Sequence, residues 1–205
     1  MICCVIVWAG MTISRAQLWS DPVALTEDTV EKSPSFLPAR KDLANYYIAQ
    51  GKKEKGHQLL EGVIQAAGSV HYVSANIPMA HSLISEGELD EAHSILSSTL
   101  ENPGKRFVKV VNALLTLNYK RLDKTQDEQA KNRIHRENVD LFEKLKQRNA
   151  DPFIDYRMAK EYLALGDLER ARVLFDSVYH QAPASAYYRE PARKLAEKLA
   201  DQLND

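Results

Sequence analysis

The sequence has few of the residues that build disulfide frameworks, metal sites or flexible linkers. Its two cysteines, Cys3 and Cys4, are adjacent in a chain of 205 residues. Neighbouring cysteines rarely bridge each other and match no zinc spacing, so no disulfide or metal framework is expected to support the fold. The chain holds eight glycines, which argues against long flexible linkers. No useful length alternates apolar and polar residues with a period of two, so we expect no β-sheet.

The chain also lacks an excess of charge and the common catalytic motifs. Its formal net charge is −1, which is not the electrostatic footprint of a nucleic-acid binder. Its six histidines are scattered and form neither of the His-x3-His and His-Glu-x2-His patterns of helical metal sites. There is no nucleophile elbow and no glycine-rich phosphate loop. We therefore expect no enzymatic activity, no cofactor, no metal and no nucleic-acid partner.

What the sequence does contain is one spacing of small and bulky residues that occurs three times. In each occurrence a bulky residue, a glycine, a small residue and a second bulky residue follow one another at intervals of four, five and four. A helix breaker stands eight residues later. The three sets are Tyr47, Gly51, Gly56 and Leu60; Leu83, Gly87, Ala92 and Leu96; and Tyr162, Gly166, Ala171 and Phe175.

This spacing predicts a helical hairpin. The first helix ends at the glycine, which can adopt the left-handed conformation of a helix C-cap without a Cβ clash. The small residue five positions later lets the second helix approach the first closely, and the second bulky residue fills the groove between the two helices.

The spacing resembles the signature of the tetratricopeptide repeat, in which an aromatic residue of the first helix is followed by a small residue, a bulky residue and a proline. The resemblance implies an all-α fold, an α-solenoid of helix–turn–helix hairpins closed by a C-terminal capping helix. It also implies a non-enzymatic scaffold that binds a protein or peptide in its concave groove. The pattern names no particular partner and no oligomeric state.

The repeats suggest a division of the whole chain. A degenerate half-repeat comes first, in which Ser20 or Asp21 can cap a helix with Pro22 in its first turn. At the C-terminus, leucines recur every four residues among charges, as a terminal capping helix requires. The expected segments are an apolar segment at 1–14, the half-repeat at 15–36, a tetratricopeptide-like array at 37–184 with repeats at about 37–68, 73–104, 107–148 and 152–183, and a capping helix at 185–205 carrying Leu195, Leu199 and Leu203.

The repeat at 107–148 diverges from the others. Asp123 stands where the turn glycine is expected, and the charged stretch at 125–148 predicts a second helix about two turns longer than usual. Such a helix either extends as a solvated arm or adds a contact surface, and we favour the solvated arm.

In a superhelix of such hairpins the first helices line the concave face, which selects polar candidates for binding. These are Lys41, Asn45, His81, Tyr156 and Lys160. Lys41-x3-Asn45 resembles half of the dicarboxylate clamp of some tetratricopeptide domains. The other half is missing, because Pro78 occupies the matching asparagine position in the next repeat.

The first thirteen residues carry no charge, and Arg15 follows shortly after. This run is shorter than the about 20 residues that a transmembrane helix needs, and it has neither the basic start nor the cleavage site of a good signal peptide. Three interpretations stay open for residues 1–14. They are the end of a membrane span, an imperfect signal or signal-anchor, or a buried helix packed on the first repeat.

The apolar run and the segment from Arg15 through Trp19 to Pro34 lead directly into the repeats. This order is similar to the junction in bacterial membrane proteins of the O-mannosyltransferase (GT-C glycosyltransferase) type, whose last membrane helix leads into an extracytoplasmic tetratricopeptide tail. The resemblance implies an alternative function, that of an accessory tail of such a membrane protein. It predicts membrane attachment through residues 1–14 with extracytoplasmic repeats, and the alternative is a soluble cytoplasmic protein.

Overall fold

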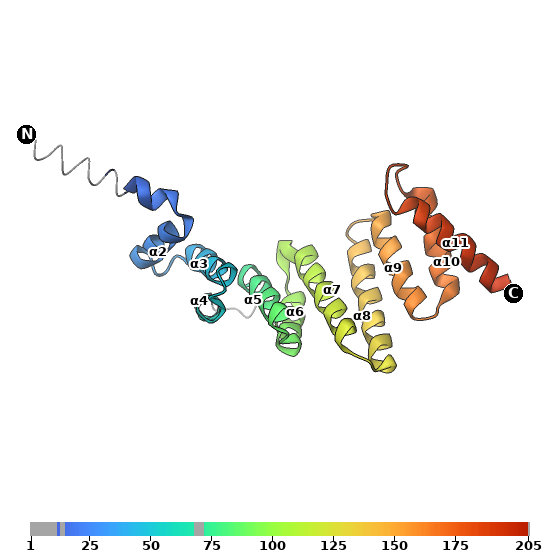
Figure 1. Ribbon diagram of the computed structural model, residues 1–205, viewed down its shortest axis with the longest axis horizontal. Coiled ribbons are helices and arrows are strands. Elements are labelled where there is room, and N and C mark those ends of the chain that lie inside the picture. The colour runs from blue at the N-terminus through green and yellow to red at the C-terminus, as the bar shows by residue number, and fades with distance from the viewer. Residues whose placement is uncertain (1–11, 13–14, 68–71, 205) are drawn as a thin grey trace, which may run out of the picture. The chain divides into compact units, whose positions relative to one another are not determined.

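A computed structural model describes residues 12, 15–67 and 72–204 (Figure 1). The chain divides into two compact units, an N-terminal unit that ends at Arg106 and a C-terminal unit that begins at Phe107. Apart from Thr12, the apolar segment 1–14 lies outside the described residues, so all three interpretations of it stay predictions. No helix in the described part of the chain is long and apolar enough to cross a membrane.

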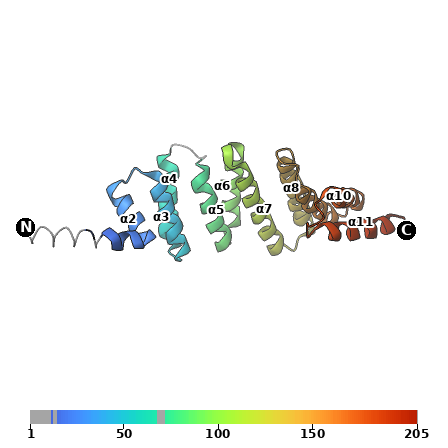
Figure 2. The ribbon, with the colours of Figure 1, turned by 90° about the horizontal axis from the view of Figure 1, so that it is seen from above.

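The N-terminal unit consists of helices that pack in chain order. Residues 15–20 are helical, and α2 packs on α3, α3 on α4, α4 on α5 and α5 on α6. Figure 2 shows α5 beside α6 as one such pair. The elements are α2 (Pro22–Lys32), α3 (Leu37–Ala49), α4 (Lys53–Ala66), α5 (Val73–Glu86), α6 (Leu89–Glu101) and a short 3-10 helix, η1 (Gly104–Arg106).

The start of α2 forms as the sequence predicts. The Asp21 carboxylate accepts hydrogen bonds from the backbone N–H groups of Val23, at 2.8 Å, and Ala24, at 3.2 Å. Pro22 occupies the first turn, where a missing N–H breaks no intrahelical bond. Helix α2 buries none of its residues fully, as suits a degenerate half-repeat.

The turn glycines have the left-handed backbone that the spacing requires. Gly51, Gly87 and Gly166 have φ values of 78°, 91° and 76°. A residue with a Cβ is strained in this region, whereas glycine is not. Each of these glycines lies in the turn between the two helices of a hairpin, so the predicted turns are confirmed.

The small residues lie where the paired helices come closest. A Cβ added to Gly56 would be 2.5 Å from Cγ1 of Ile48 and 2.9 Å from the carbonyl oxygen of Ala44 on α3. Ala92 and Ala171, which follow the other two turn glycines, are completely buried. The bulky residues that end each set, Leu60, Leu96 and Phe175, are completely buried as well.

The C-terminal unit also packs its helices in chain order, α7 to α8, α8 to α9, α9 to α10 and α10 to α11. Helices α7 and α9 run in one direction and α8 and α10 in the other (Figure 1). The elements are α7 (Phe107–Lys124), α8 (Glu128–Lys146), α9 (Pro152–Ala164), α10 (Leu168–Gln181) and α11 (Arg189–Asn204).

The divergent hairpin differs from the expectation. Asp123 lies within α7, and the chain turns at 125–127, where the Asp127 side chain caps α8 by accepting from the N–H of Gln129 at 2.9 Å. The prediction of a turn at Asp123 was therefore wrong, because α7 continues to Lys124 and both helices of the hairpin are long. The first residues of α8 are exposed or half-buried, but from Ile134 onward the helix buries one face.

The last helix packs on α10 through a stripe that shares only Leu199 with the one predicted. Its buried residues are Ala192, Ala196 and Leu199, whereas Leu195 is half-buried and Leu203 is 40% exposed. The two alanines allow α11 to approach α10 closely, which turns the leucine row partly away from the contact. Helical hairpins therefore build both units, and the described residues contain no strand.

Candidate functional site

A pocket of about 610 Å³ opens among α7, α8, α9 and the loop that precedes α11. Helices α7 and α9 are the first helices of their hairpins, so this pocket, the α7–α9 groove, lies on the side where the sequence predicts binding. Its lining residues are Tyr119, Leu122, Asp123, His135, Phe153, Tyr156, Arg157, Lys160, Glu161, Ala164 and Tyr187.

Two of the five predicted binding residues meet in this groove. Tyr156 and Lys160 both line it, one turn apart on α9. Lys41 and Asn45 lie on α3 and His81 on α5, all in the N-terminal unit. Lys41 is paired with the Asp42 carboxylate at 3.0 Å, Asn45 is half-buried and His81 is exposed. A binding role for these three residues stays a prediction.

One end of the groove is aromatic. The ring centroid of Phe153 lies 6.3 Å from that of Tyr156 in a stacked arrangement and 6.0 Å from that of Tyr187. Tyr156 meets Phe175 edge to face at 5.7 Å, which ties the cluster to the core of the last hairpin. Tyr187 is 76% exposed, so this cluster offers aromatic surface that the fold itself does not bury.

Two cations follow the aromatic end along α9. The Arg157 guanidinium lies 4.8 Å from the ring centroid of Phe142 and 5.6 Å from that of Tyr119, so cation–π contacts hold it in place. Lys160 is exposed. Neither side chain forms an ion pair with another residue that the structure describes.

Behind the groove wall, a buried carboxylate joins three helices. Glu161 on α9 is 3% exposed. Its Oε1 accepts a hydrogen bond from the Tyr119 hydroxyl at 2.6 Å, and its Oε2 accepts from Nδ1 of His135 at 2.7 Å and from Nδ2 of Asn138 at 3.2 Å. Buried carboxylates need such donors because desolvation without partners is costly. The arrangement fixes α7 and α8 relative to α9.

Hydrogen bonds extend this arrangement along α7 and α8. Asn118 donates to Oδ1 of Asn138 at 2.9 Å, and Arg121 donates to Oδ1 of Asn118 at 3.1 Å and to Glu137 at 3.1 Å. Asn118 and Asn138 are both fully enclosed. We call the set the Glu161 network; its members are Asn118, Tyr119, Arg121, His135, Glu137, Asn138 and Glu161.

The environment of the network changes the ionisation of Tyr119. Partial burial, followed by the hydrogen bond to the negatively charged Glu161, raises the pKa of the Tyr119 hydroxyl to about 12. The positive charge of Arg157 opposes the shift without cancelling it. Tyr119 therefore stays a hydrogen-bond donor to Glu161 throughout the neutral range.

The sequence reasoning missed the Glu161 network, although a signal was present. Asn118 follows Leu114 by four positions, Asn138 lies midway between Ile134 and Phe142, and Glu161 follows Met158 by three. Each polar residue thus occupies an apolar stripe of its helix. A polar side chain at such a position needs a buried partner, which the sequence pattern indicates but does not identify.

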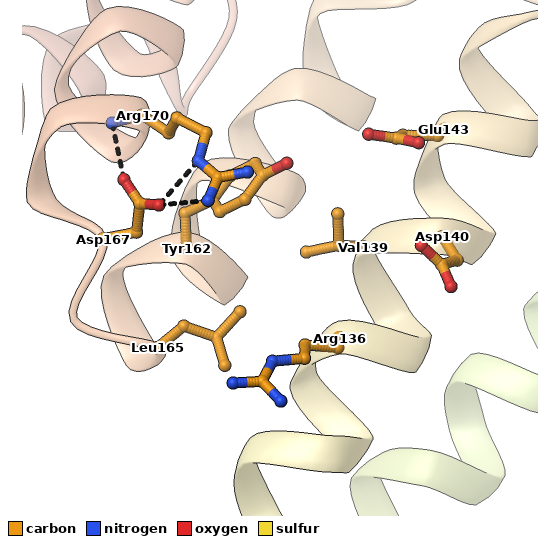
Figure 3. A pocket seen from close by; sticks show the side chains of 8 residues that line it. All are labelled: Arg136, Val139, Asp140, Glu143, Tyr162, Leu165, Asp167 and Arg170. Atoms are coloured by element: carbon orange, nitrogen blue, oxygen red, sulfur yellow. Dashed lines mark hydrogen bonds and ion pairs between the residues drawn. The ribbon is translucent and has the colours of Figure 1, made fainter.

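A second pocket of about 500 Å³ lies among α8, α9 and the start of α10 (Figure 3). Arg170 folds back onto the cap residue Asp167. The Asp167 carboxylate accepts hydrogen bonds from the backbone N–H of Arg170, at 3.1 Å, and from Nε of Arg170, at 2.6 Å. The guanidinium also lies 4.6 Å from the ring centroid of Tyr162. The hydrogen bonds from Arg170 lower the pKa of the Asp167 carboxyl. This pair is satisfied internally, and Asp167 is the N-cap residue of α10.

Neither pocket has the donors of a metal site. Among the residues that the structure places, no three His, Cys, Asp or Glu side chains are grouped so that they could hold a metal ion. The buried carboxylate beside the α7–α9 groove, Glu161, already accepts three hydrogen bonds. What the groove offers is recognition chemistry, namely aromatic faces, two cations and one exposed carboxylate at Asp123.

The sequence matches no protein-family model and no curated protein. Solved structures of tetratricopeptide (TPR) proteins are similar to it. YrrB, described as a TPR protein with an unusual peptide-binding site, has a TM-score of 0.57 and 12% identity over 86% of this chain and 89% of its own. A Podosopora anserina protein with nearly identical TPR-like repeats has a TM-score of 0.50 and 17% identity over 83% and 88%. These likenesses show the fold, which is all-α and of the tetratricopeptide type.

Proposed function

We propose that this chain is a non-enzymatic scaffold that binds a segment of another protein, and that the α7–α9 groove is its principal contact surface. The observation that carries the proposal is a groove between two first helices that combines exposed aromatic surface with two unpaired cations. Interfaces are enriched in aromatic and arginine side chains of this kind. YrrB, a protein of similar fold, is described as having a peptide-binding site, which supports the same use here.

The Glu161 network supports the proposal from behind the groove. Because it ties α7, α8 and α9 together through buried hydrogen bonds, the groove walls are held in position before a partner arrives. A preformed surface loses less conformational freedom on binding than a mobile one. The network also keeps its carboxylate away from an incoming ligand, since three donors already surround Glu161.

The test is a selection of peptides from a random displayed library on the full-length chain. Each enriched peptide is then measured against a groove variant, Lys160→Ala with Tyr187→Ala, and a matched control, Lys198→Ala with Tyr46→Ala. All four side chains are exposed, so neither variant should unfold. We expect enriched peptides to lose about tenfold or more in affinity for the groove variant alone. Equal affinity for both variants, or no enrichment, would contradict the proposal.

The same selected peptides can test whether the N-terminal unit takes part in binding. Replacing Lys41, Asn45 and His81 with alanine removes the predicted polar candidates on α3 and α5. If these residues bind the partner, the affinity of the selected peptides falls. If only the groove variant weakens binding, the C-terminal unit carries recognition by itself.

Membrane attachment through residues 1–14, with repeats outside the cytoplasm, is a second proposal and rests on the sequence pattern of the junction. Trp19, just beyond the apolar run, is 67% exposed, and exposed tryptophans are common at membrane interfaces. Fractionation of the full-length protein and of a variant lacking 1–14 tests it. Recovery of both forms in the soluble fraction would remove the proposal, and with it the role as an accessory tail of a glycosyltransferase-like membrane protein.

A further inference from the structure

We infer that the α7–α9 groove selects a partner segment in which an aromatic side chain lies close to a carboxylate side chain. This inference rests on the proposed function and adds the chemistry of the bound segment. Some charged groups in the groove already form hydrogen bonds or ion pairs within the protein, and others do not. The inference follows from this difference and from the order in which the unpaired groups lie along the groove.

The charges that face the groove divide into satisfied and unsatisfied groups. Glu161 accepts three hydrogen bonds, one of them from His135, so neither group is available to a ligand without breaking the Glu161 network. Arg157, Lys160 and Asp123 line the groove without an ion pair to any residue that the structure describes. The α9 wall therefore presents two positive charges, and among the described residues that line the groove the unpaired negative charge is Asp123 of α7.

The order of these groups follows from the direction of the helices. Helices α7 and α9 run the same way (Figure 1), and Tyr119 of α7 lies level with Arg157 and Glu161 of α9. Asp123, one turn beyond Tyr119, therefore lies toward Ala164 and away from Phe153. Along the groove, the aromatic cluster is followed in space by two cations and then by a carboxylate.

The aromatic end suits a large planar side chain. Phe153, Tyr156 and Tyr187 expose ring faces and edges at angles that range from stacked to tilted. An aromatic guest can stack on one ring and meet another edge to face, so it gains ring–ring attraction in addition to simple burial. An aliphatic guest gains the burial alone. The aromatic residue of the segment is expected at this end.

The cations require a neighbouring carboxylate rather than a polyanion. Arg157 is held between Tyr119 and Phe142, so its guanidinium is oriented before binding and loses little freedom when it bonds a carboxylate. A nucleic-acid strand would bring several phosphates, of which two would meet cations and the next would approach Asp123. That repulsion, together with a chain net charge of −1, disfavours nucleic acid.

The direct test is fluorescence anisotropy with the full-length chain and short labelled peptides. The first peptide carries a tryptophan followed by two glutamates, the second replaces both glutamates with lysines, and the third replaces the tryptophan with alanine. We expect the first peptide to bind at least about fivefold more tightly than either of the others, and its affinity to fall as salt is added.

A charge reversal in the groove makes the test specific. Lys160→Glu should weaken the glutamate peptide by about fivefold or more and strengthen the lysine peptide, whereas Lys198→Glu, on the exposed face of α11, should change neither. A circular dichroism melt of each variant confirms that the fold is retained. Equal binding of the glutamate and lysine peptides, or an unchanged affinity in Lys160→Glu, would overturn the inference.

Failure of this inference is distinguishable from failure of the proposed function. If library peptides depend on the groove but carry no acidic residue beside an aromatic one, the groove is a binding surface with another preference, and only the inference is wrong. If no library peptide depends on the groove, both are wrong.

Discussion

The first hairpin of the N-terminal unit brings α4 against α3 through Gly56, whereas the matching positions in the other two hairpins that carry the repeat spacing are alanines, Ala92 in the same unit and Ala171 in the C-terminal unit. The buried side-chain hydrogen bonds also differ between the two units. In the N-terminal unit, Asn76 donates to the Thr99 hydroxyl at 2.9 Å, which links the two helices of one hairpin. In the C-terminal unit, Glu161 accepts donors from both helices of the preceding hairpin.

The difference shows that one repeat signature can be stabilised in two ways. A bond within a hairpin strengthens that hairpin, but it does not set how the next hairpin lies. A bond between hairpins fixes the first helices against each other, and those helices are the walls of a groove. The Glu161 network therefore explains why a defined groove with an aromatic end is found between α7 and α9.

The largest effect is expected where both units share the same close contact. Ala92→Glu and Ala171→Glu each place a charge at a completely buried position between paired helices. Each should lower the free energy of unfolding by about 3–5 kcal/mol, because a buried charge without a partner is strongly destabilising. Urea unfolding followed by circular dichroism measures the change.

The matched control for these substitutions is Val173→Glu, on the same helix as Ala171 but 50% exposed. It should change the free energy of unfolding by no more than about 0.5 kcal/mol. A tolerated Ala171→Glu would mean that the repeat register assigned to the last hairpin is wrong.

The Glu161 network and the Asn76–Thr99 hydrogen bond should contribute different amounts to the free energy of unfolding. Glu161→Ala leaves three donors from two helices without their acceptor and should cost about 3 kcal/mol. Asn76→Ala removes a bond to Thr99, whose hydroxyl still donates to the carbonyl of Ile95 at 2.6 Å, and should cost about 1 kcal/mol.

Binding separates these two variants further. Glu161→Ala should also weaken peptides selected on the groove, while Asn76→Ala should leave their affinity unchanged. Equal effects of both variants on unfolding and binding would contradict the distinction between bonds within and between hairpins.

The glycines of α4 give a smaller and more local test. Gly56→Ala pushes a methyl group against the Ala44 backbone and should destabilise by about 1–2 kcal/mol. At Gly62 an added Cβ meets only the flexible end of Arg40, so Gly62→Ala should stabilise the helix by up to about 1 kcal/mol. Thermal melts of the two variants should therefore shift in opposite directions, and a shift in the same direction would argue against the α3–α4 contact.

A further expected effect is a dependence of stability on alkaline pH in the C-terminal unit. The folded pKa of Tyr119, about 12, lies above the ordinary value of 10.0, so its contribution is complete below about pH 10 and is lost as the pH rises toward about 12. The melting temperatures of the wild type and Tyr119→Phe should differ by a constant amount up to about pH 10 and converge above it. A constant difference across the whole range would show that the hydroxyl does not donate to Glu161.

Parts of the candidate site could be predicted from the sequence because they depend on helix position alone. Tyr156 and Lys160 were predicted from their place on a first helix, and both line the groove; their role in binding stays a prediction. Arg157 was not among the predicted residues, because its contacts with Tyr119 and Phe142 come from two other helices. Tyr187 lies in a loop, where helical periodicity predicts nothing.

By itself, the sequence determined the three hairpins that carry the repeat spacing: a glycine with positive φ ends the first helix, and a small residue follows where the second helix crosses it. These are local requirements, set by one backbone conformation and one close contact. The tertiary structure alone decided that α7 continues past Asp123, that α11 packs through alanines, and that Glu161 meets donors from two other helices. The last two depend on side chains far apart in the sequence, whose pairing depends on how neighbouring helices pack.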